Sequence, residues 1–353
     1  MAYTTIDDPT IYFNTKLYAG DGTAIGSGGQ SITGVGFQPD WVWIKDRTDS
    51  DRPRMFDAVR GVTKELDASD STAETTISEG LTSFDSDGFT VGNHAGVNSS
   101  GDNFVAWNWL GANGTASNTD GDITSTVSVN TTAGFSIVSW TGNATAGATI
   151  GHGLGSNLGM IIIKNRSSAT NWVVYHNSIA ATEHLRLNGT NAEITGSGTF
   201  NNTEPTSSVF SLGSGTATNE NTSNFIAYCF ADKKGYSKFG SYTGNGNADG
   251  TFVYTGFKPA WVMVKGTANA SNWNMFDNQR SQPNQASSQG ILRANLSSAE
   301  FTGSTALFVD FLSNGFKFRG NSVDTNRSGE KFIYMSFAES PFVSSGGIPT
   351  TAI

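Results

Sequence analysis

The fold of this chain is decided by a short apolar stretch that ends in a lysine, GFQPDWVWIK at residues 36–45. Two further versions follow, LGMIIIK at residues 158–164 and GFKPAWVMVK at residues 256–265. The lysines therefore stand at positions 45, 164 and 265, a spacing too even for chance. Self-similarity of this kind is the signature of a repeated structural unit, so the sequence predicts three copies of one building block.

An aromatic residue recurs at the same distance after each of these lysines, as Phe56, Tyr175 and Phe276. An equal offset predicts a hairpin of fixed length, because a one-residue slip in register would turn the core face of a strand outward. Aromatic residues flanking Ser-Asp-Gly at residues 84–89 and Ser-Asn-Gly at residues 311–316 predict two further hairpins. The second copy matches this pattern only loosely.

Each copy closes on an alternating strand: FVAWNW at residues 104–109, FIAYCF at 225–230 and FIYMSF at 332–337. The first and last aromatic residues of each are five apart, so they face opposite sides of a flat strand. We therefore expect both faces of the sheet to be covered. The apolar stretches before the lysines also indicate strands that are buried on both faces.

Composition agrees with an all-β chain. Among 353 residues there are 42 glycines, 11% aromatic residues and 14% charged residues, which is typical of many short strands joined by small polar turns. The sequence predicts three tandem antiparallel β-sandwich or jelly-roll-like repeats. Their expected boundaries are 1–112 with an N-terminal arm, 113–233, and 234–353 with a C-terminal tail. Helix signals are confined to residues 55–64 and 178–183.

Charge and hydropathy exclude two classes of partner. The net charge of −9 argues against a nucleic-acid binder. No apolar run approaches the ~20 residues of a membrane-spanning helix, so we expect no membrane insertion. The excess of acidic residues lies in residues 1–112. Either a partner meets the negative field of this region, or these residues form a solvated acidic face.

The repeats supply an internal test of function. A residue type present in all three copies is structural, because an active site is rarely needed three times in one chain. Lys45, Lys164 and Lys265 are therefore expected at strand ends or interfaces. Trp172 and Trp273 share one position of the repeat, and we expect them in the core or in contact with a partner protein or glycan.

The loop after Lys45 carries the densest charge in the chain. Three of its carboxylates, on Asp46, Asp49 and Asp51, supply the oxygen ligands that Ca²⁺ takes. The interleaved arginines favour a self-neutralised surface loop instead, with no metal. These arginines are also candidates for contact with a partner or a glycan: Arg47, Arg52 and Arg54.

No motif for catalysis is found. The four histidines lack metal-ligand spacing, no Gly-x-Ser-x-Gly string occurs, and nothing pairs two carboxylates for glycoside hydrolysis. A polysaccharide depolymerase would need such a pair in a cleft. We therefore expect a chain that is not an enzyme and binds no cofactor.

Several strings resemble a repeat found in structural proteins of tailed bacteriophages, especially marine ones. They are HGLG at residues 152–155, IIIKNRS at 161–167 and NWVVYH at 171–176, together with the opening DDP and YFNT between residues 7 and 15. The resemblance covers almost the whole chain. The first and third copies lack the HGLG string, so any special role of His152 is confined to the second copy.

The resemblance implies a non-enzymatic virion protein: a tail fibre, a spike or a head-surface decoration component. Such a protein is made and assembled in the bacterial cytoplasm and ends in the virion. Its expected partners are other virion proteins and further copies of itself, as a trimer where it forms a fibre or spike. The alternative function is an adhesin or receptor-binding module that contacts glycans of the host surface.

Overall fold

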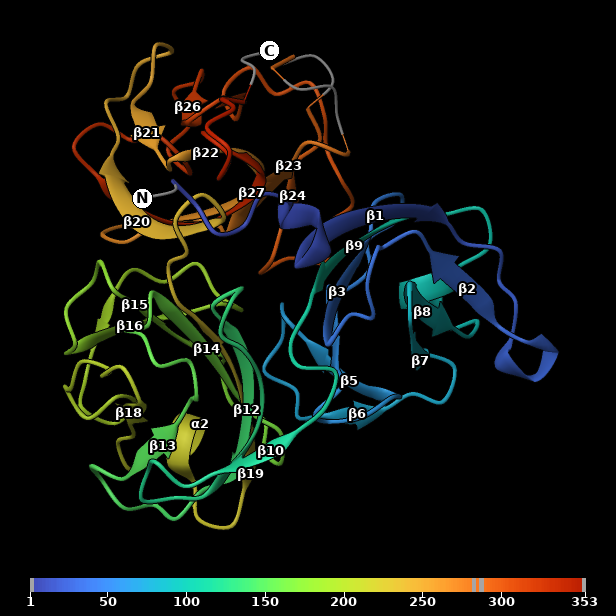
Figure 1. The fold of residues 1–353 in the computed structure, drawn as a ribbon, viewed down its shortest axis with the longest axis vertical. Helices are drawn as coiled ribbons and strands as arrows, with labels where there is room; N and C mark the ends of the chain where they lie inside the picture. Colours follow the sequence, from blue (N-terminus) through green and yellow to red (C-terminus); the bar gives the residue numbers. More distant parts are fainter. Residues whose placement is uncertain (1–2, 281–283, 286–288, 351–353) are drawn as a thin grey trace.

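The computed structural model describes residues 3–280, 284–285 and 289–350. These residues form three lobes around a common centre (Figure 1). The first lobe spans residues 13–109, the second 116–230 and the third 237–341. All pairings between their named strands are antiparallel, so the expected all-β class is confirmed.

The first lobe holds a larger sheet of order β1-β9-β3-β4-β5-β6 and a smaller sheet of order β2-β8-β7. The short helices η1 (Pro9–Ile11), η2 (Ile25–Ser27) and α1 (Ala95–Asn98) flank these strands. The strands are β1 (Phe13–Ala19), β2 (Gln30–Thr33), β3 (Trp41–Asp46), β4 (Arg54–Asp57), β5 (Lys64–Asp67), β6 (Thr75–Thr76), β7 (Leu81–Asp85), β8 (Gly88–Val91) and β9 (Asn103–Trp109).

The second lobe has a larger sheet of order β10-β11-β12-β19-β14-β15-β16-β17 and a smaller pair, β13-β18. Its short helix is α2 (Thr216–Asn219). The strands are β10 (Ala116–Asn118), β11 (Ser125–Asn130), β12 (Phe135–Thr141), β13 (Thr149–Gly151), β14 (Met160–Asn165), β15 (Val173–His176), β16 (Glu183–Arg186), β17 (Ile194–Thr195), β18 (Val209–Ser211) and β19 (Asn224–Phe230).

The third lobe has a larger sheet of order β20-β27-β22-β23-β24 and a smaller sheet of order β21-β26-β25. The strands are β20 (Ser237–Thr243), β21 (Phe252–Tyr254), β22 (Phe257–Gly266), β23 (Asn274–Asp277), β24 (Leu292–Arg293), β25 (Val309–Leu312), β26 (Gly315–Phe318) and β27 (Lys331–Pro341). The stretches that end in Lys45, Lys164 and Lys265 thus lie at corresponding places, beside the closing strand of each lobe.

The expected burial on both faces is confirmed. In β3 the side chains of Trp41 and Trp43 face a core at the centre of the molecule, whereas Val42 and Ile44 face a core inside the first lobe. The strands β14 and β22 alternate in the same way. Successive side chains of a strand point to opposite faces, so one strand contributes to two cores.

The central core joins the three larger sheets. Trp41 of the first lobe stacks on Tyr228 of the second with ring centroids 4.3 Å apart. Phe13 of the first lobe stacks on Phe337 of the third at 4.9 Å. Aromatic side chains bury large apolar areas, so the three lobes exclude water from one shared interior.

The predicted hairpins are found where they were expected. Asp85 pairs with Gly88 between β7 and β8, and Leu312 pairs with Gly315 between β25 and β26. Neither segment with helix signals is helical: residues 55–64 run from β4 into β5, and residues 178–183 lead from β15 into β16. The short helices lie instead at α1 and α2, just before the closing strands.

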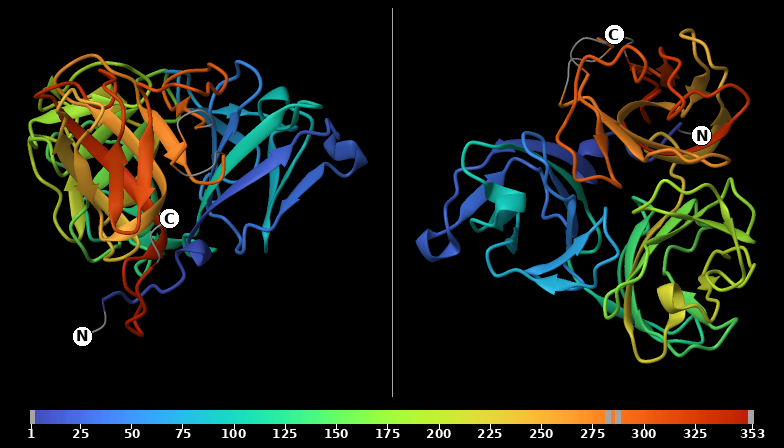
Figure 2. Two further views of the ribbon diagram at one scale, coloured as in Figure 1. Left: turned by 90° about the horizontal axis from the view of Figure 1, so that it is seen from above. Right: turned by 180° about the vertical axis from the view of Figure 1, so that it is seen from behind.

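The described segments near the two ends of the chain lie together on one side of the molecule (Figure 2). The carboxylate of Asp7 accepts a hydrogen bond from the Ser345 main-chain N–H at 2.6 Å. Residues 1–10 were expected to lie outside the core, yet Ile6 is buried in the central core. The N-terminal arm therefore crosses from the first lobe to the third. Within the described ranges, no helix is both long and apolar enough to cross a membrane.

Candidate functional site

The lysine that ends each apolar stretch reaches out of its own lobe. Lys45, Lys164 and Lys265 are buried, and each ammonium group donates to main-chain oxygens of its own lobe. Each also donates to one main-chain oxygen of a neighbouring lobe: Lys45 to Ser297 at 3.0 Å, Lys164 to Ser71 at 2.9 Å and Lys265 to Thr190 at 3.4 Å. The first lobe thus contacts the third, the third the second, and the second the first.

Removal from water dominates the electrostatics of these lysines. Burial lowers the pKa of each ammonium group to about 8, with nearby carboxylates acting in the opposite direction. The groups are still protonated at neutral pH, so each can donate all its hydrogen bonds. Carbonyl oxygens receive these protons, which satisfies a charge that would be costly to bury alone. The prediction of lysines at strand ends and interfaces is confirmed.

A glutamate of the neighbouring lobe adds a second contact beside each lysine. Its main-chain N–H donates to the carbonyl of the residue two positions after the lysine, at 2.8 to 3.0 Å. The three pairs are Glu300 with Arg47, Glu74 with Arg166 and Glu193 with Thr267. In the first two pairs the side chains also form ion pairs at 2.8 Å. The same junction is therefore built three times.

The indole N–H groups of the two paired tryptophans also cross between lobes. Trp172 donates to the main-chain oxygen of Asp67 at 2.7 Å, and Trp273 donates to that of Arg186 at 2.9 Å. Both rings are buried, with exposed fractions of 0% and 1%. They cannot stack on a sugar or touch a separate partner, so the prediction of glycan or partner contact through them is wrong. The first lobe carries Pro53 at this position.

The arginines of the charged loop are paired inside the protein. Arg47 binds the carboxylate of Glu300 with Nε and Nη2 at 2.9 and 2.8 Å. Arg54 pairs with Asp51 at 2.8 Å and with Glu65. Arg52 is half-exposed and binds Asp67 at 3.2 Å and Asp70 at 3.1 Å. The structure thus places these candidates in internal ion pairs, and Arg52 is the most accessible of the three.

The carboxylates of the same loop do not form a metal site. Asp46 is buried, and its Oδ1 accepts the main-chain N–H groups of Thr48 and Asp49 at 2.8 and 3.0 Å. Asp51 is held by Arg54. Among the residues that the structure describes, no three His, Cys, Asp or Glu side chains are grouped so that they could hold a metal ion.

A further set of contacts was missed by the sequence analysis. Asp57, twelve residues after Lys45, forms a fully buried ion pair with Arg60, and Tyr228 of the second lobe donates to its Oδ2 at 2.8 Å. Asp277 and Arg280 repeat this pair in the third lobe, where Trp107 of the first lobe donates to Asp277 at 3.0 Å.

The second lobe has His176 at the corresponding position, and its Nε2 donates to the main-chain oxygen of Tyr334 in the third lobe at 3.1 Å. The similar strings MFD, VYH and MFD at this place were visible in the sequence. Nothing in them indicated that their last residues face another lobe.

A cavity lies on the second lobe, beside the third. It has a volume of about 480 Å³ and is lined by Asn157, Tyr175, Asn177, Glu204 and Asp232, among others. The third lobe is adjacent, because Asp232 forms an ion pair with Lys238. Asp232 also lines a second hollow of about 630 Å³ on the third lobe, which includes Tyr3 and Tyr254. The two hollows therefore adjoin at Asp232. None of these residues was predicted from the sequence to bind a ligand, and Tyr175 was expected only as the recurring aromatic residue of a hairpin.

Comparison with known proteins gives the family but no activity. Neither a curated protein nor a solved structure matches the chain. One family model matches residues 8–341, which cover all three lobes, and its description is a domain of unknown function, DUF7483. The chain belongs to the DUF7483 family.

Proposed function

We propose that the three lobes are three copies of one antiparallel β-sandwich repeat, with boundaries near 1–112, 113–233 and 234–353. The order of strands supports this, because in each larger sheet the closing strand lies between the lysine-bearing strand and one earlier strand, which is β1, β12 or β20. The core between the larger and smaller sheets of each lobe supports it as well. One chain would then enclose a pseudo-threefold axis that other proteins create with three subunits.

We infer that this ring is a non-enzymatic structural component of a bacteriophage particle. The observation that carries the proposal is the closed set of lysine contacts, in which each lobe donates to the next around the centre. Such a set ties every lobe to both of its neighbours, as expected of a rigid building block. The resemblance of the repeat to structural proteins of tailed bacteriophages supports the assignment to a virion.

A head-surface position suits this architecture better than a fibre. A fibre or spike is expected to be a trimer of chains, whereas one copy of this chain already carries three lobes. A site on the particle with threefold or pseudo-threefold symmetry would match the ring. The adjoining segments near the two ends of the chain, on one face, would suit attachment to other virion proteins or to a further copy of the chain (Figure 2).

Particles of the encoding phage, purified by density gradient, test the proposal. Mass spectrometry is expected to detect the chain at a constant copy number per particle, and a reconstruction of the particle is expected to place it on the head surface. Absence of the chain from purified particles would overturn the structural role. Its presence on a fibre would keep that role and reject the head-surface position.

The alternative function, an adhesin that contacts host glycans, is not supported by Trp172 and Trp273, since both rings are enclosed between lobes. The cavity on the second lobe, beside the third, is a separate observation that bears on glycan binding.

A further inference from the structure

We propose that the cavity on the second lobe, beside its junction with the third, is a binding site for a neutral oligosaccharide. The inference does not depend on the place of the chain in a virion. The three junctions share the same strands and lysine contacts, but different residues occupy the corresponding positions beside them.

At the junction between the first and second lobes, the position of Asp40 is filled by the chain itself, and the hollow nearby, of about 310 Å³, is lined by Ala112, Gly114, Thr115, Ala116, Val127 and Val129 without a charged side chain. Asp40 is buried there, and its Oδ2 accepts the main-chain N–H groups of Gly111 and Asn113 at 2.7 and 3.2 Å. The Ser128 hydroxyl of β11 donates to Asp40 at 3.4 Å. The connection between the lobes and an additional strand thus occupy this place.

The junction between the third and first lobes is nearly filled as well. The short helix η1 packs there against β1 and β27. Glu339 accepts a hydrogen bond from the Asn278 amide at 2.7 Å and binds Lys258 at 2.9 Å. The cavity that is left has a volume of about 40 Å³, too small for any organic ligand.

The corresponding place on the second lobe, beside the third, borders a cavity of about 480 Å³, within the range of about 300–1,000 Å³ of ligand pockets. Gly159 stands where the first lobe has Asp40, and it brings no side chain. Asp232 stands where the others have Gly111 and Glu339, two residues after the last aromatic of the closing strand.

The wall of this cavity differs in the second lobe alone. Phe56 and Phe276 are fully buried, whereas the corresponding Tyr175 has a hydroxyl group that donates to Glu204. Burial, followed by this carboxylate, raises the pKa of Tyr175 well above its usual value, so the hydroxyl remains a donor. The bond uses Oε2 of Glu204, whose Oε1 is left for a ligand.

The polar groups of the cavity suit hydroxyl groups. Glu204, Asp232 and Asn177 are exposed at its wall, together with Asn157. Among the described residues no group forms a hydrogen bond with the Asn157 amide, so its donor and its acceptor are both available. Carboxylates accept and amides both donate and accept, which is the combination that neighbouring sugar hydroxyls require.

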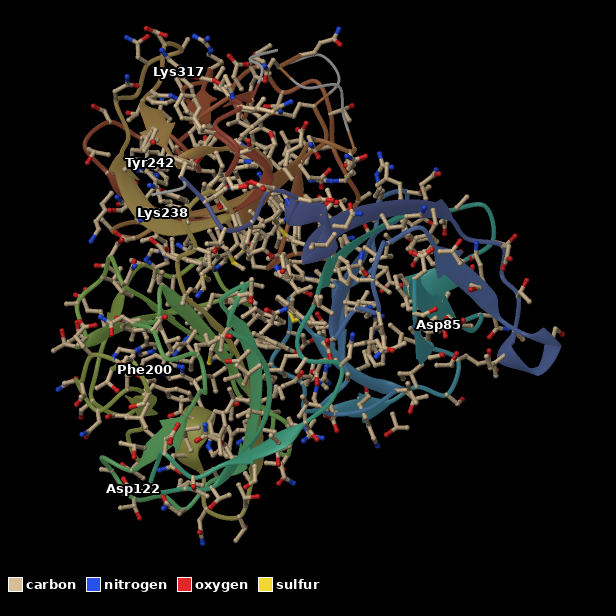
Figure 3. The ribbon with its side chains drawn as sticks, viewed as in Figure 1. Asp85, Asp122, Phe200, Lys238, Tyr242 and Lys317 are labelled. Atoms are coloured by element: carbon tan, nitrogen blue, oxygen red, sulfur yellow. The ribbon has the colours of Figure 1, made fainter. Side chains whose placement is uncertain are left out.

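The charges around the two hollows balance. Asp232 is paired with Lys238, which Figure 3 places on the third lobe beside its boundary with the second. Lys234 lies 4.3 Å from the ring centroid of Tyr3, and Glu204 supplies the second negative charge. Lys234 and Lys238 line the second hollow, Glu204 lines the cavity and Asp232 lines both, so the two hollows together carry two cations and two anions, which favours a neutral ligand over an anionic one.

Three main-chain N–H groups at the cavity or beside it are not available to a peptide strand. The N–H groups of Gly159, Asn177 and Phe239 already donate to Phe230, Gly159 and Asp232 at 2.7 to 2.9 Å. A peptide strand needs free main-chain groups for recognition. The adjoining hollow instead offers the ring of Tyr254, which is 55% exposed and can stack on a sugar face.

An array of immobilised oligosaccharides, neutral and uronic-acid-containing, tests the site with the full chain, followed by calorimetry with the neutral oligosaccharide that gives the highest signal. We expect Asp232→Asn and Glu204→Gln each to weaken binding about tenfold, and Tyr175→Phe about threefold. Tyr175→Phe restores the residue of the other two lobes, so its folding is safe.

Glu339→Gln is the matched control, because it makes the same kind of change at the corresponding position of the filled junction. It is expected to leave binding unchanged. The proposal is overturned if the chain binds no neutral oligosaccharide, if it binds only uronic-acid chains, or if Glu339→Gln weakens binding as much as Asp232→Asn. Unchanged affinity in all three cavity variants would overturn it as well.

Discussion

The ammonium group of Lys45 lies 3.0 Å from the main-chain oxygen of Ser297, although 252 residues separate them in the chain. Lys164 and Lys265 form the corresponding contacts with Ser71 and Thr190. These contacts run in one direction around the centre of the molecule. The closure of the ring therefore depends on three side chains that are each buried at the end of a strand.

Lys164→Met removes the contact between the second and first lobes. It leaves the main-chain oxygens of Ser71 and Thr170 without their donor, while the methionine avoids the burial of a charge. We expect a net loss of about 2 kcal/mol in the free energy of unfolding, measured by urea denaturation. Lys64→Met is the control, because its partner Thr76 is exposed on the surface. Equal effects of the two changes would contradict the role of Lys164.

The indole N–H of Trp172 gives the second prediction. Trp172→Phe loses ring volume and the hydrogen bond to Asp67. Trp140→Phe makes the same volume change at a buried ring whose N–H has no hydrogen-bond partner among the described residues. Thermal and urea unfolding are expected to show Trp172→Phe less stable than Trp140→Phe by about 1 kcal/mol. A smaller loss at Trp172 would argue against the contact between lobes.

The buried pair of Asp57 and Arg60 gives the third prediction. Asp57→Ala leaves the Arg60 guanidinium enclosed, with Glu74 at 3.3 Å as its remaining carboxylate among the described residues. Removing one member of a buried ion pair costs about 3–5 kcal/mol, since the remaining charge is uncompensated. Addition of Arg60→Met to Asp57→Ala is expected to recover part of that loss. Denaturation curves of the single and double variants check this, and a double variant less stable than Asp57→Ala would contradict it.

His176 makes the contact between the second and third lobes sensitive to acid. Its Nε2 donates to Tyr334, while its Nδ1 accepts the main-chain N–H of Ser178 at 3.1 Å. This arrangement requires the neutral ring. Burial lowers the pKa of His176 to about 4, and Lys331 acts in the same direction. Protonation of Nδ1 would place its new N–H against the main-chain N–H of Ser178, so that hydrogen bond would be lost.

The sign of the effect follows from proton binding. Between about pH 4 and 6.5 the unfolded chain binds a proton at His176 and the folded chain does not, so stability falls as the pH falls through this range. Between pH 6.5 and 5, the free energy of unfolding should fall by about 1 kcal/mol less in His176→Gln than in the unaltered chain. Urea denaturation at each pH measures this difference. The pKa of His184 is also lowered to about 4, so His184→Gln is measured alongside. Parallel curves for His176→Gln and the unaltered chain would contradict the prediction.

Local pattern was sufficient for the all-β class and for the position of many strands. An apolar stretch that ends in a lysine and is bounded by turn residues predicts a strand whose two faces are both buried. The equal offset from Lys45 to Phe56 predicted the register between β3 and β4, where Val42 faces Phe56. Helix propensity at residues 55–64 was overruled because the ends of that segment belong to β4 and β5, which pair in the larger sheet, and residues 58–63 form the turn between them.

What the sequence determined by itself is local: strands, turns and three similar segments that each carry a buried lysine. Only the tertiary structure decided which lobe each lysine reaches, that Trp172 and Trp273 are enclosed, and that a cavity remains beside one junction. These outcomes depend on contacts between residues far apart in the chain. An apolar face of one lobe can be buried by side chains from either of the other lobes. A periodic pattern specifies that a face must be buried, whereas the shape and charge of the opposite surface specify what buries it.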